Sequence, residues 1–227
     1  TILHNRFNRP WQEWPREYRD RADLGDIKRA FSDNIERVKH EQYRFFSQWS
    51  AVKRYANEHG IEIIGDIPLF VSADSADVWA HREFFMLDNS GYPLLTAGAP
   101  PDGFSADGQN WNTPVYNWDE IKRSSYIWWK NRLAHCMKLY DQVRIDHFRG
   151  LSAGYAIKNS ETAKDGEWMF GPGLDFFKNV YSADMRLIAE DLGVLDRSVY
   201  NLLELSGLPG MNVWQFNVGA NPAQSPF

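Results

Sequence analysis

The sequence predicts an α/β fold with a parallel sheet, which we interpret as an incomplete portion of a (β/α)8 TIM barrel. Apolar segments of strand length alternate with amphipathic segments of helix length, and most connections between them are short. The predicted strands are apolar throughout, which is typical of a sheet covered by helices. Acidic residues stand near the carboxyl ends of these strands, where a barrel gathers its functional side chains.

A doubly wound sheet is the competing architecture. Nucleotide-binding folds of that class carry a glycine-rich turn after a strand, and neither G-x-G-x-x-G nor G-x-x-x-x-G-K occurs in the sequence. Only about four strands can be recognised, whereas a barrel has eight strands and about 250 residues. We therefore expect residues 1–227 to be part of a single catalytic barrel domain, with the remaining strands outside this chain.

The elements follow one another along the chain by their periodicity. A helix is predicted over 26–58, where apolar residues from Ile27 to Ala56 recur at three- and four-residue spacings until Gly60 ends it. The predicted strands are 61–68, 140–147, 185–193 and 211–216, and the further helices are 122–139, 173–183 and 196–206. The stretches 69–121 and 151–172 hold few regular periods and are predicted as long inserted loops.

Composition excludes several classes of protein. With 25 basic and 30 acidic residues and no block of like charge, sequence-independent nucleic-acid binding is not expected. No apolar segment approaches the roughly 18 residues of a membrane helix, and the segment Thr1–His4 does not resemble a signal peptide. The single cysteine, Cys136, shares an apolar stripe with Leu133 and Met137, so we expect a packing role and a reducing, cytoplasmic location.

The segment VRIDHFRG, residues 143–150, ends a predicted strand on charged residues. Arg144 and Asp146 lie two apart and share a face, and a neighbouring guanidinium favours the ionised carboxylate, as a nucleophile requires. The alternative is a structural ion pair that closes the strand. His147 faces the opposite way if the strand stays regular, and no second His or Cys lies at the spacing of a metal site.

Glu190 is the candidate proton donor. It follows the apolar residues RLIA, where partial burial would raise its pKa, although it could also simply mark where the chain leaves the core. Asp191 would face away and cap the next segment of the chain. Retaining glycosidases need two carboxyl groups about 5–5.5 Å apart, and strands about 4.8 Å apart can supply that separation for Asp146 and Glu190.

The loop GAPPDGFSADGQNWNTPVYNWD, residues 98–119, combines turn-forming Pro and Gly with recurrent aromatic residues. Aromatic rings flanked by Asp, Asn and Gln can form a platform for a sugar, which has an apolar face and a polar edge. The alternative is a surface loop whose aromatic residues pack against one another.

Five blocks and a short motif together resemble one family, the amylomaltases, which are 4-alpha-glucanotransferases (disproportionating enzymes) of the alpha-amylase clan. The blocks are IGDIPLFVSADSADVWAHREFF (64–85), GAPPDGFSADGQNWNTPVYNW (98–118), VRIDHFRG (143–150), GPG (171–173) and IAEDLG (188–193), together with LPGM (208–211). They span most of the chain in the family's order. The resemblance implies transfer of a segment of an α-1,4-glucan to a new 4-hydroxyl group by a retaining double displacement.

The resemblance also implies roles for individual residues. Asp146 would be the nucleophile, Glu190 the general acid/base, and Arg144 the partner that orients Asp146, with His147 beside the sugar in the first donor subsite. The loop over the glucan would include Asp102, Phe104, Ser105 and Trp111, and Asp66 would lie at the foot of the cleft in a structural or sugar-binding role. The substrates would be maltooligosaccharides and α-1,4-glucans, with no pyridoxal phosphate, nucleotide or metal cofactor.

One family feature has no match in this sequence. The family's third acid is an Asp that follows a His near a later strand, and no His occurs after His147. This gap favours one alternative to the transferase, a glucan-binding module without catalysis. A second alternative is an α-glucan hydrolase of the same clan, in which water takes the place of the acceptor. An intact Arg144, Asp146 and Glu190 favour an enzyme over a binding module.

Overall fold

The structure is a computed structural model that describes residues 1–214 except 23, 104, 159–161, 183 and 194. The described strands form a three-stranded parallel sheet and a four-stranded antiparallel sheet. The α/β class is therefore confirmed. The strands in the described part of the chain do not close into a barrel, as expected of an incomplete portion.

The helices largely follow the predicted ranges. The α-helices are α1 (Ile2–Phe7), α2 (Arg16–Arg19), α3 (Gly25–Ala30), α4 (Ser32–Glu58), α5 (Ala76–Ala80), α6 (Trp118–Arg123), α7 (Ile127–Leu139), α8 (Leu174–Val180) and α9 (Arg197–Ser206). Short 3-10 turns are η1 (Trp11–Glu13), η2 (Arg82–Phe84), η3 (Phe148–Leu151) and η4 (Ala163–Asp165). The predicted helix 26–58 is divided at Phe31, and 122–139 is divided where Ser125 and Tyr126 take positive φ angles of 55° and 58°.

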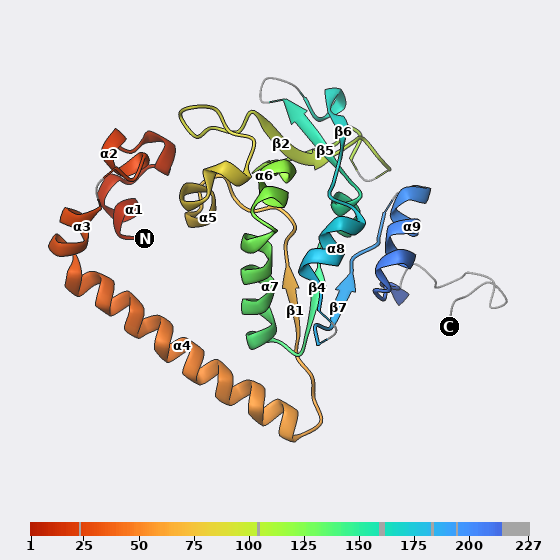
Figure 1. The fold of residues 1–227 in the computed structure, drawn as a ribbon, viewed down its shortest axis with the longest axis horizontal. Helices are drawn as coiled ribbons and strands as arrows, with labels where there is room; N and C mark the ends of the chain where they lie inside the picture. The colour runs from red at the N-terminus through yellow and green to blue at the C-terminus, as the bar shows by residue number, and fades with distance from the viewer. Residues whose placement is uncertain (23, 104, 159–161, 183, 194, 215–227) are drawn as a thin grey trace.

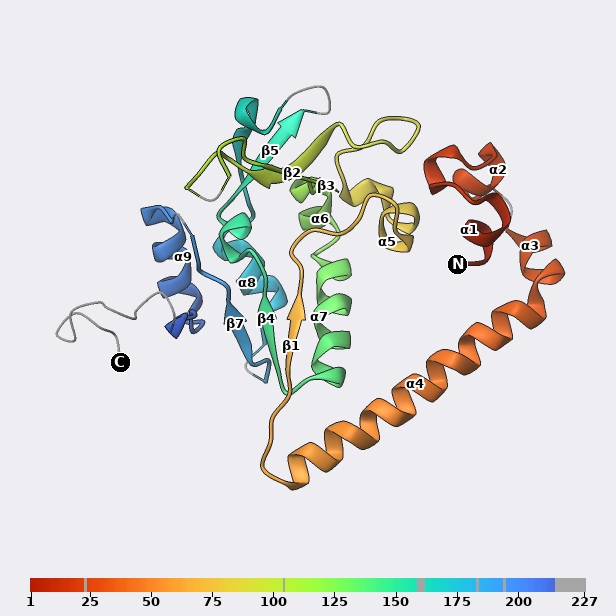
Figure 2. The ribbon, with the colours of Figure 1, turned by 180° about the vertical axis from the view of Figure 1, so that it is seen from behind.

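The parallel sheet contains three of the predicted strands, β1 (Ile64–Ile67), β4 (Gln142–Ile145) and β7 (Leu187–Ala189), in the order β1-β4-β7. Helices α7 and α8 lie in front of these strands in Figure 1, and Figure 2 shows the opposite face with no helix over it. The side chains alternate accordingly: Val143 and Ile145 of β4 are buried, whereas Arg144 between them is partly exposed on the bare face. The sheet therefore presents Arg144 where a closed barrel would have its interior.

The fourth predicted strand, 211–216, is not confirmed. Residues 211–213 are not in a strand, and 215–216 lie outside the described residues. The preceding segment lies next to β7, where the backbone N–H of Ala189 donates to the Pro209 carbonyl over 2.9 Å.

The prediction of irregular loops at 69–121 and 151–172 is wrong in part. These stretches contain the strands β2 (Leu95–Ala99), β3 (Gln109–Pro114), β5 (Ala153–Lys158) and β6 (Glu167–Phe170), paired in the order β3-β2-β5-β6. Strands β2 and β3 approach so closely at Gly98 that a Cβ there would lie 2.0 Å from the Gln109 carbonyl oxygen, which explains the glycine. The antiparallel sheet caps the carboxyl end of the parallel one (Figure 1).

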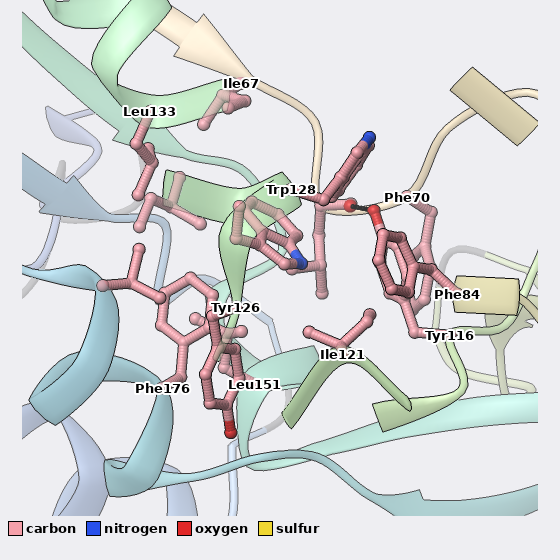
Figure 3. Close-up of a cluster of buried hydrophobic side chains, with 14 of the residues drawn as sticks. Ile67, Phe70, Phe84, Tyr116, Ile121, Tyr126, Trp128, Leu133, Leu151 and Phe176 are labelled. Atoms are coloured by element: carbon pink, nitrogen blue, oxygen red, sulfur yellow. Dashed lines mark hydrogen bonds between the residues drawn. The ribbon is translucent and has the colours of Figure 1, made fainter. Parts of the chain in front are cut away.

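A dense aromatic core joins the two sheets (Figure 3). Trp129, Leu133 and Phe176 are at most 1% exposed and pack between the helices and β4. The buried Tyr116 hydroxyl donates to the Leu69 carbonyl over 2.6 Å, which satisfies its only polar atom. This core holds the segment after β1 against the hairpin β2–β3.

Helix α4 is much more exposed to solvent than this core. Its apolar face exists as predicted, yet none of its described residues is buried, and Phe45 and Val52 are 51% and 53% exposed. It meets the body near α7, where the Trp49 indole N–H donates to the Leu139 carbonyl over 2.8 Å. No helix in the described part of the chain combines the length and apolar character needed to cross a bilayer.

Candidate active site

The carboxyl ends of the parallel strands bring the predicted acidic residues together. Asp146 follows β4 and donates its backbone N–H to the Ile67 carbonyl of β1, and Glu190 follows β7 and donates to the Ile145 carbonyl of β4, both over 3.0 Å. These bonds continue the ladder just beyond the strands. Both side chains therefore start from backbone that the sheet fixes.

Arg144 links two carboxylates on the bare face. Its Nε and Nη2 donate to the two oxygens of Asp66 over 2.9 and 2.8 Å, and Nη2 also donates to Asp146 Oδ1 over 2.8 Å. The hydrogen bonding to Asp66 is the main reason that the pKa of Arg144 is raised. The bidentate pair with Asp66 fixes the guanidinium plane, so a permanent cation is presented to Asp146, as predicted.

Asp66 contacts Arg144 directly, because the strand register sets the two residues side by side. Asp66 does not line the cavity that contains Asp146, but it lines a neighbouring cavity that shares Pro68 with it. The contact with Arg144 is the structural one of the two roles considered for this residue, and the sugar-binding role stays a prediction.

Glu190 sits in a different environment. Its Oε2 accepts the backbone N–H of His147 over 2.9 Å, and its Oε1 accepts that of Leu192 over 3.0 Å. Burial raises the pKa of Glu190, the nearby Asp146 charge adds to the rise, and the two backbone hydrogen bonds oppose it. The raised pKa matches the direction expected from the sequence.

His147 leaves the strand in a left-handed turn, with φ at 52°, so strand alternation no longer applies to it. Its ring meets Trp111 edge to face, with centroids 4.8 Å apart. Burial, and then the charge of Arg149, lower the pKa of His147 to about 4, which leaves the ring neutral near pH 7. Nε2 is buried and has no hydrogen-bond partner among the described residues.

These groups line two adjoining cavities. The first encloses about 480 Å³ and contains Asp146, Arg144 and Phe70 in its wall. The second encloses about 250 Å³ under the β2–β3 loop and contains Asp102 and Trp168. Both are lined by Trp111, His147 and Glu190, so these three side chains lie where the two cavities of the cleft meet.

The loop residues predicted from the sequence divide into two groups. Trp111 and Asp102 line the cleft. Ser105 does not; its hydroxyl donates to the Gly108 carbonyl over 2.7 Å, and its N–H donates to Asp102 Oδ1 over 2.7 Å, so it closes the tip of the loop. Phe104 lies outside the described residues.

Among the charged and aromatic residues that line the cleft, sequence reasoning missed Phe70, Arg149 and Trp168. Arg149 stands within VRIDHFRG, but its partner Trp168 is on β6, which was predicted as loop. Because β6 was not predicted as a strand, no local pattern in the sequence identified Trp168 as a residue of the cleft. Asp191 does face away as expected, although its Oδ1 accepts the N–H of Met211 over 2.6 Å and thereby holds the 208–211 turn.

Metal ligation finds no support in the described residues, where no group of three or more His, Cys, Asp or Glu side chains is arranged to hold an ion. Cys136 packs against the core in part, and burial raises the pKa of its thiol.

Comparison with known proteins gives a consistent result. The family model described as 4-alpha-glucanotransferase matches residues 1–227. A 4-alpha-glucanotransferase of Thermus thermophilus is 43% identical over 212 residues, which are 91% of this chain and 42% of that protein. One from Streptococcus pneumoniae serotype 4 is 41% identical over 215 residues, or 92% of this chain and 43% of that protein.

Solved structures agree. An amylomaltase from Streptococcus agalactiae, in complex with acarbose, superposes with a TM-score of 0.91 at 40% identity, covering 98% of this chain and 46% of that one. An amylomaltase from Corynebacterium glutamicum gives a TM-score of 0.62 at 24% identity over 72% of this chain and 23% of that one, which bears on the fold alone. This chain spans less than half the length of these relatives.

Proposed function

Because the chain belongs to the 4-alpha-glucanotransferase family, we propose that the protein transfers a segment of an α-1,4-glucan to the 4-hydroxyl group of another glucan. Asp146 is the nucleophile and Glu190 the general acid/base in this proposal. The observation that carries it is the contrast between the two carboxyl groups: Asp146 accepts from the Arg144 cation, whereas burial raises the pKa of Glu190.

The reaction has two steps that reuse both groups. An oxygen of Asp146 attacks the anomeric carbon, the glycosidic C–O bond breaks, and the departing oxygen takes the proton of Glu190. The Glu190 carboxylate then removes the proton of the acceptor 4-hydroxyl group, whose oxygen attacks the same carbon and releases Asp146. Each attack inverts the anomeric centre, so the two together retain the α configuration.

The remaining groups have supporting roles. Arg144, fixed by Asp66, orients Asp146. The neutral His147 and the Trp111 ring lie at the junction of the two cavities, where we place the first donor sugar. Asp102, Ser105 and Phe104 belong to the loop over the glucan, with Ser105 acting through the shape of the loop tip.

The substrates we propose are maltooligosaccharides and longer α-1,4-glucans. The acarbose complex of the Streptococcus agalactiae amylomaltase supports this, since that protein matches 98% of the chain. Residues 1–227 would form part of one catalytic barrel domain. A cytoplasmic location stays a prediction; the rice relative, at 42% identity, is named as chloroplastic/amyloplastic.

Maltotriose distinguishes the proposal from its alternatives, using the polypeptide encoded by the whole reading frame. Glucose together with maltopentaose and longer products indicates transfer, whereas glucose and maltose alone indicate hydrolysis. Asp146→Asn should lower the rate at least about 10⁴-fold, as removal of a nucleophile does. Glucan binding without any products, equal in both proteins, would support a binding module instead.

A further inference from the structure

Trp168 is an exposed aromatic residue of the cleft that the proposed reaction leaves without a role. It lies on β6, is 45% exposed, and lines the smaller cavity under the β2–β3 loop. Pro100 and Pro101 line the same cavity. The exposed indole therefore belongs to a cavity that has apolar groups such as these prolines in one part of its wall and Glu190 in another.

Two side chains contact the indole, Arg149 and Tyr155, and a third, Asp196, holds Arg149. The Arg149 guanidinium carbon lies 3.9 Å from the centre of the Trp168 ring, so the guanidinium group covers one face of that ring. The Arg149 side chain is only 11% exposed, and its Nη2 donates to Asp196 Oδ2 over 2.8 Å. Tyr155 meets Trp168 edge to face with centroids 5.1 Å apart. An exposed aromatic residue held this firmly has already lost its rotamer freedom, which lowers the entropic cost of binding against it.

The position of the cavity relative to the two carboxyl groups defines which sugar it receives. Glu190 lines both cavities, but Asp146 lines only the larger one. In a double displacement the nucleophile contacts the donor sugar, whereas the acid contacts the oxygen between the donor and the leaving or accepting sugar. The cavity of Trp168 therefore lies on the side of the leaving group and the acceptor.

We propose that Trp168 is an acceptor-side platform on which the apolar face of a glucosyl residue stacks, and that Arg149 and Asp196 are its positioning residues. This inference rests on the proposed function and adds to it a residue that contacts the acceptor. The indole supplies flat apolar area of the kind a sugar face covers. Arg149 acts by holding the ring, one face of which it covers.

The test separates the acceptor step from the donor step. With α-maltotriosyl fluoride as donor, fluoride leaves without an acceptor-side sugar, and maltotriose is then added as acceptor. Trp168→Ala and Trp168→Leu should each lower kcat/KM for maltotriose at least about tenfold, with a much smaller change in kcat/KM for the fluoride. Trp168→Phe, which keeps a flat ring, should recover part of the loss.

Trp168→Leu fills most of the space of the indole without a flat face, so it remains informative if the alanine variant folds poorly. Tyr200→Ala is the matched control, because Tyr200 is an aromatic residue of α9 that is 56% exposed and lines neither cavity. The platform proposal would be wrong if kcat/KM for maltotriose in Trp168→Leu stayed within twofold of wild type. It would also be wrong if kcat/KM for maltotriose and kcat/KM for the fluoride fell equally.

Asp196→Asn tests the positioning role. Asp196 also caps α9 by accepting the N–H groups of Ser198 and Val199, and asparagine keeps that cap while losing the charge. We expect KM for maltotriose to rise about threefold without a matching fall in kcat. An unchanged KM with an unchanged thermal midpoint would remove Asp196 from the inference.

Failure of the proposed function gives a different result. Wild-type protein that forms no transfer products contradicts the transferase proposal alone. Binding of maltoheptaose, measured by calorimetry, then tests the platform without catalysis. A Kd in Trp168→Leu equal to that of wild type contradicts the platform, and a weaker Kd supports it.

Discussion

The two sheets of the molecule carry different kinds of side chain to the same cleft. The parallel sheet supplies Arg144, Asp146 and Glu190 from its strand ends, whereas the antiparallel sheet supplies Trp111 and Trp168. The two proposed reacting carboxyl groups thus come from the sheet with helices behind it, and both cleft tryptophans come from a sheet in the inserted segments. The difference suggests that one sheet is specialised for the chemical steps and the other for holding the glucan.

The two sets are also fixed differently. Glu190 accepts from two backbone N–H groups, and Arg144 is fixed by a bidentate pair. The β2–β3 loop, which leads into the strand of Trp111, is attached to η4 by an ion pair between Lys164 and Asp107, whose side chains are 55% and 84% exposed. Substitutions in the parallel sheet should therefore act mainly on kcat, and those in the antiparallel sheet mainly on KM.

Among these substitutions, replacing the proposed general acid Glu190 should lower kcat most. Glu190→Gln should lower kcat for maltotriose about 10²–10⁴-fold, because a positioned general acid contributes that much. With α-maltotriosyl fluoride as donor, the release of fluoride needs no proton, and that first step should lose far less. Equal losses with both donors would contradict the role of Glu190 as the acid.

The pH profile sharpens the same assignment. Because burial raises the pKa of Glu190, the alkaline limb of kcat/KM should lie above the usual glutamate value of about 4.3, with activity falling as pH rises through the raised pKa. Folding favours the protonated carboxyl, so its contribution to stability is present at low pH and is lost as pH rises through the same pKa. Glu190→Gln should flatten both dependences, and urea unfolding at several pH values measures the second.

Asp66→Asn should have an intermediate effect. It removes one charge from the pair that fixes Arg144, but the Asp66 side chain is 55% exposed and screened by solvent. We expect kcat to fall about three- to tenfold while KM for maltotriose changes little. A rise in KM of the same size would instead place Asp66 against the sugar.

Lys164→Gln should have the smallest effect. The Lys164–Asp107 pair is exposed, and such pairs contribute about 0–1 kcal/mol. KM for maltotriose should rise less than about threefold and kcat should stay the same, with Lys39→Gln on α4 as a control for loss of an exposed lysine pair. A fall in kcat would show that the two sheets are not separable in function.

The sequence predicts the parallel sheet well and the antiparallel sheet poorly, for physical reasons. Apolar runs such as 61–68 and 185–193 identify buried strands, and the shared face of Arg144 and Asp146 follows from strand geometry alone. Strands β3 and β6 mix polar and aromatic residues and show no buried period. The stack of Trp168 on Arg149 joins positions 19 apart through a turn, and no local pattern reports such a contact.

The long helix illustrates a second limit. Periodicity correctly predicts a helix with an apolar face near 26–58, but it says nothing about what covers that face, and the described residues leave it exposed. The break at Phe31 is equally hidden, because the apolar spacing continues across it.

The left-handed turn at His147 has a consequence for redesign. Glu190 Oε2 accepts the backbone N–H of His147, and that N–H belongs to the peptide bond that joins Asp146 to His147. One peptide bond therefore connects the positions of the two proposed reacting groups. Their relative placement is then a property of one backbone turn and cannot be adjusted by side-chain choice alone. Transplanting the pair into another scaffold would require moving the turn, with both strand ends, as one piece.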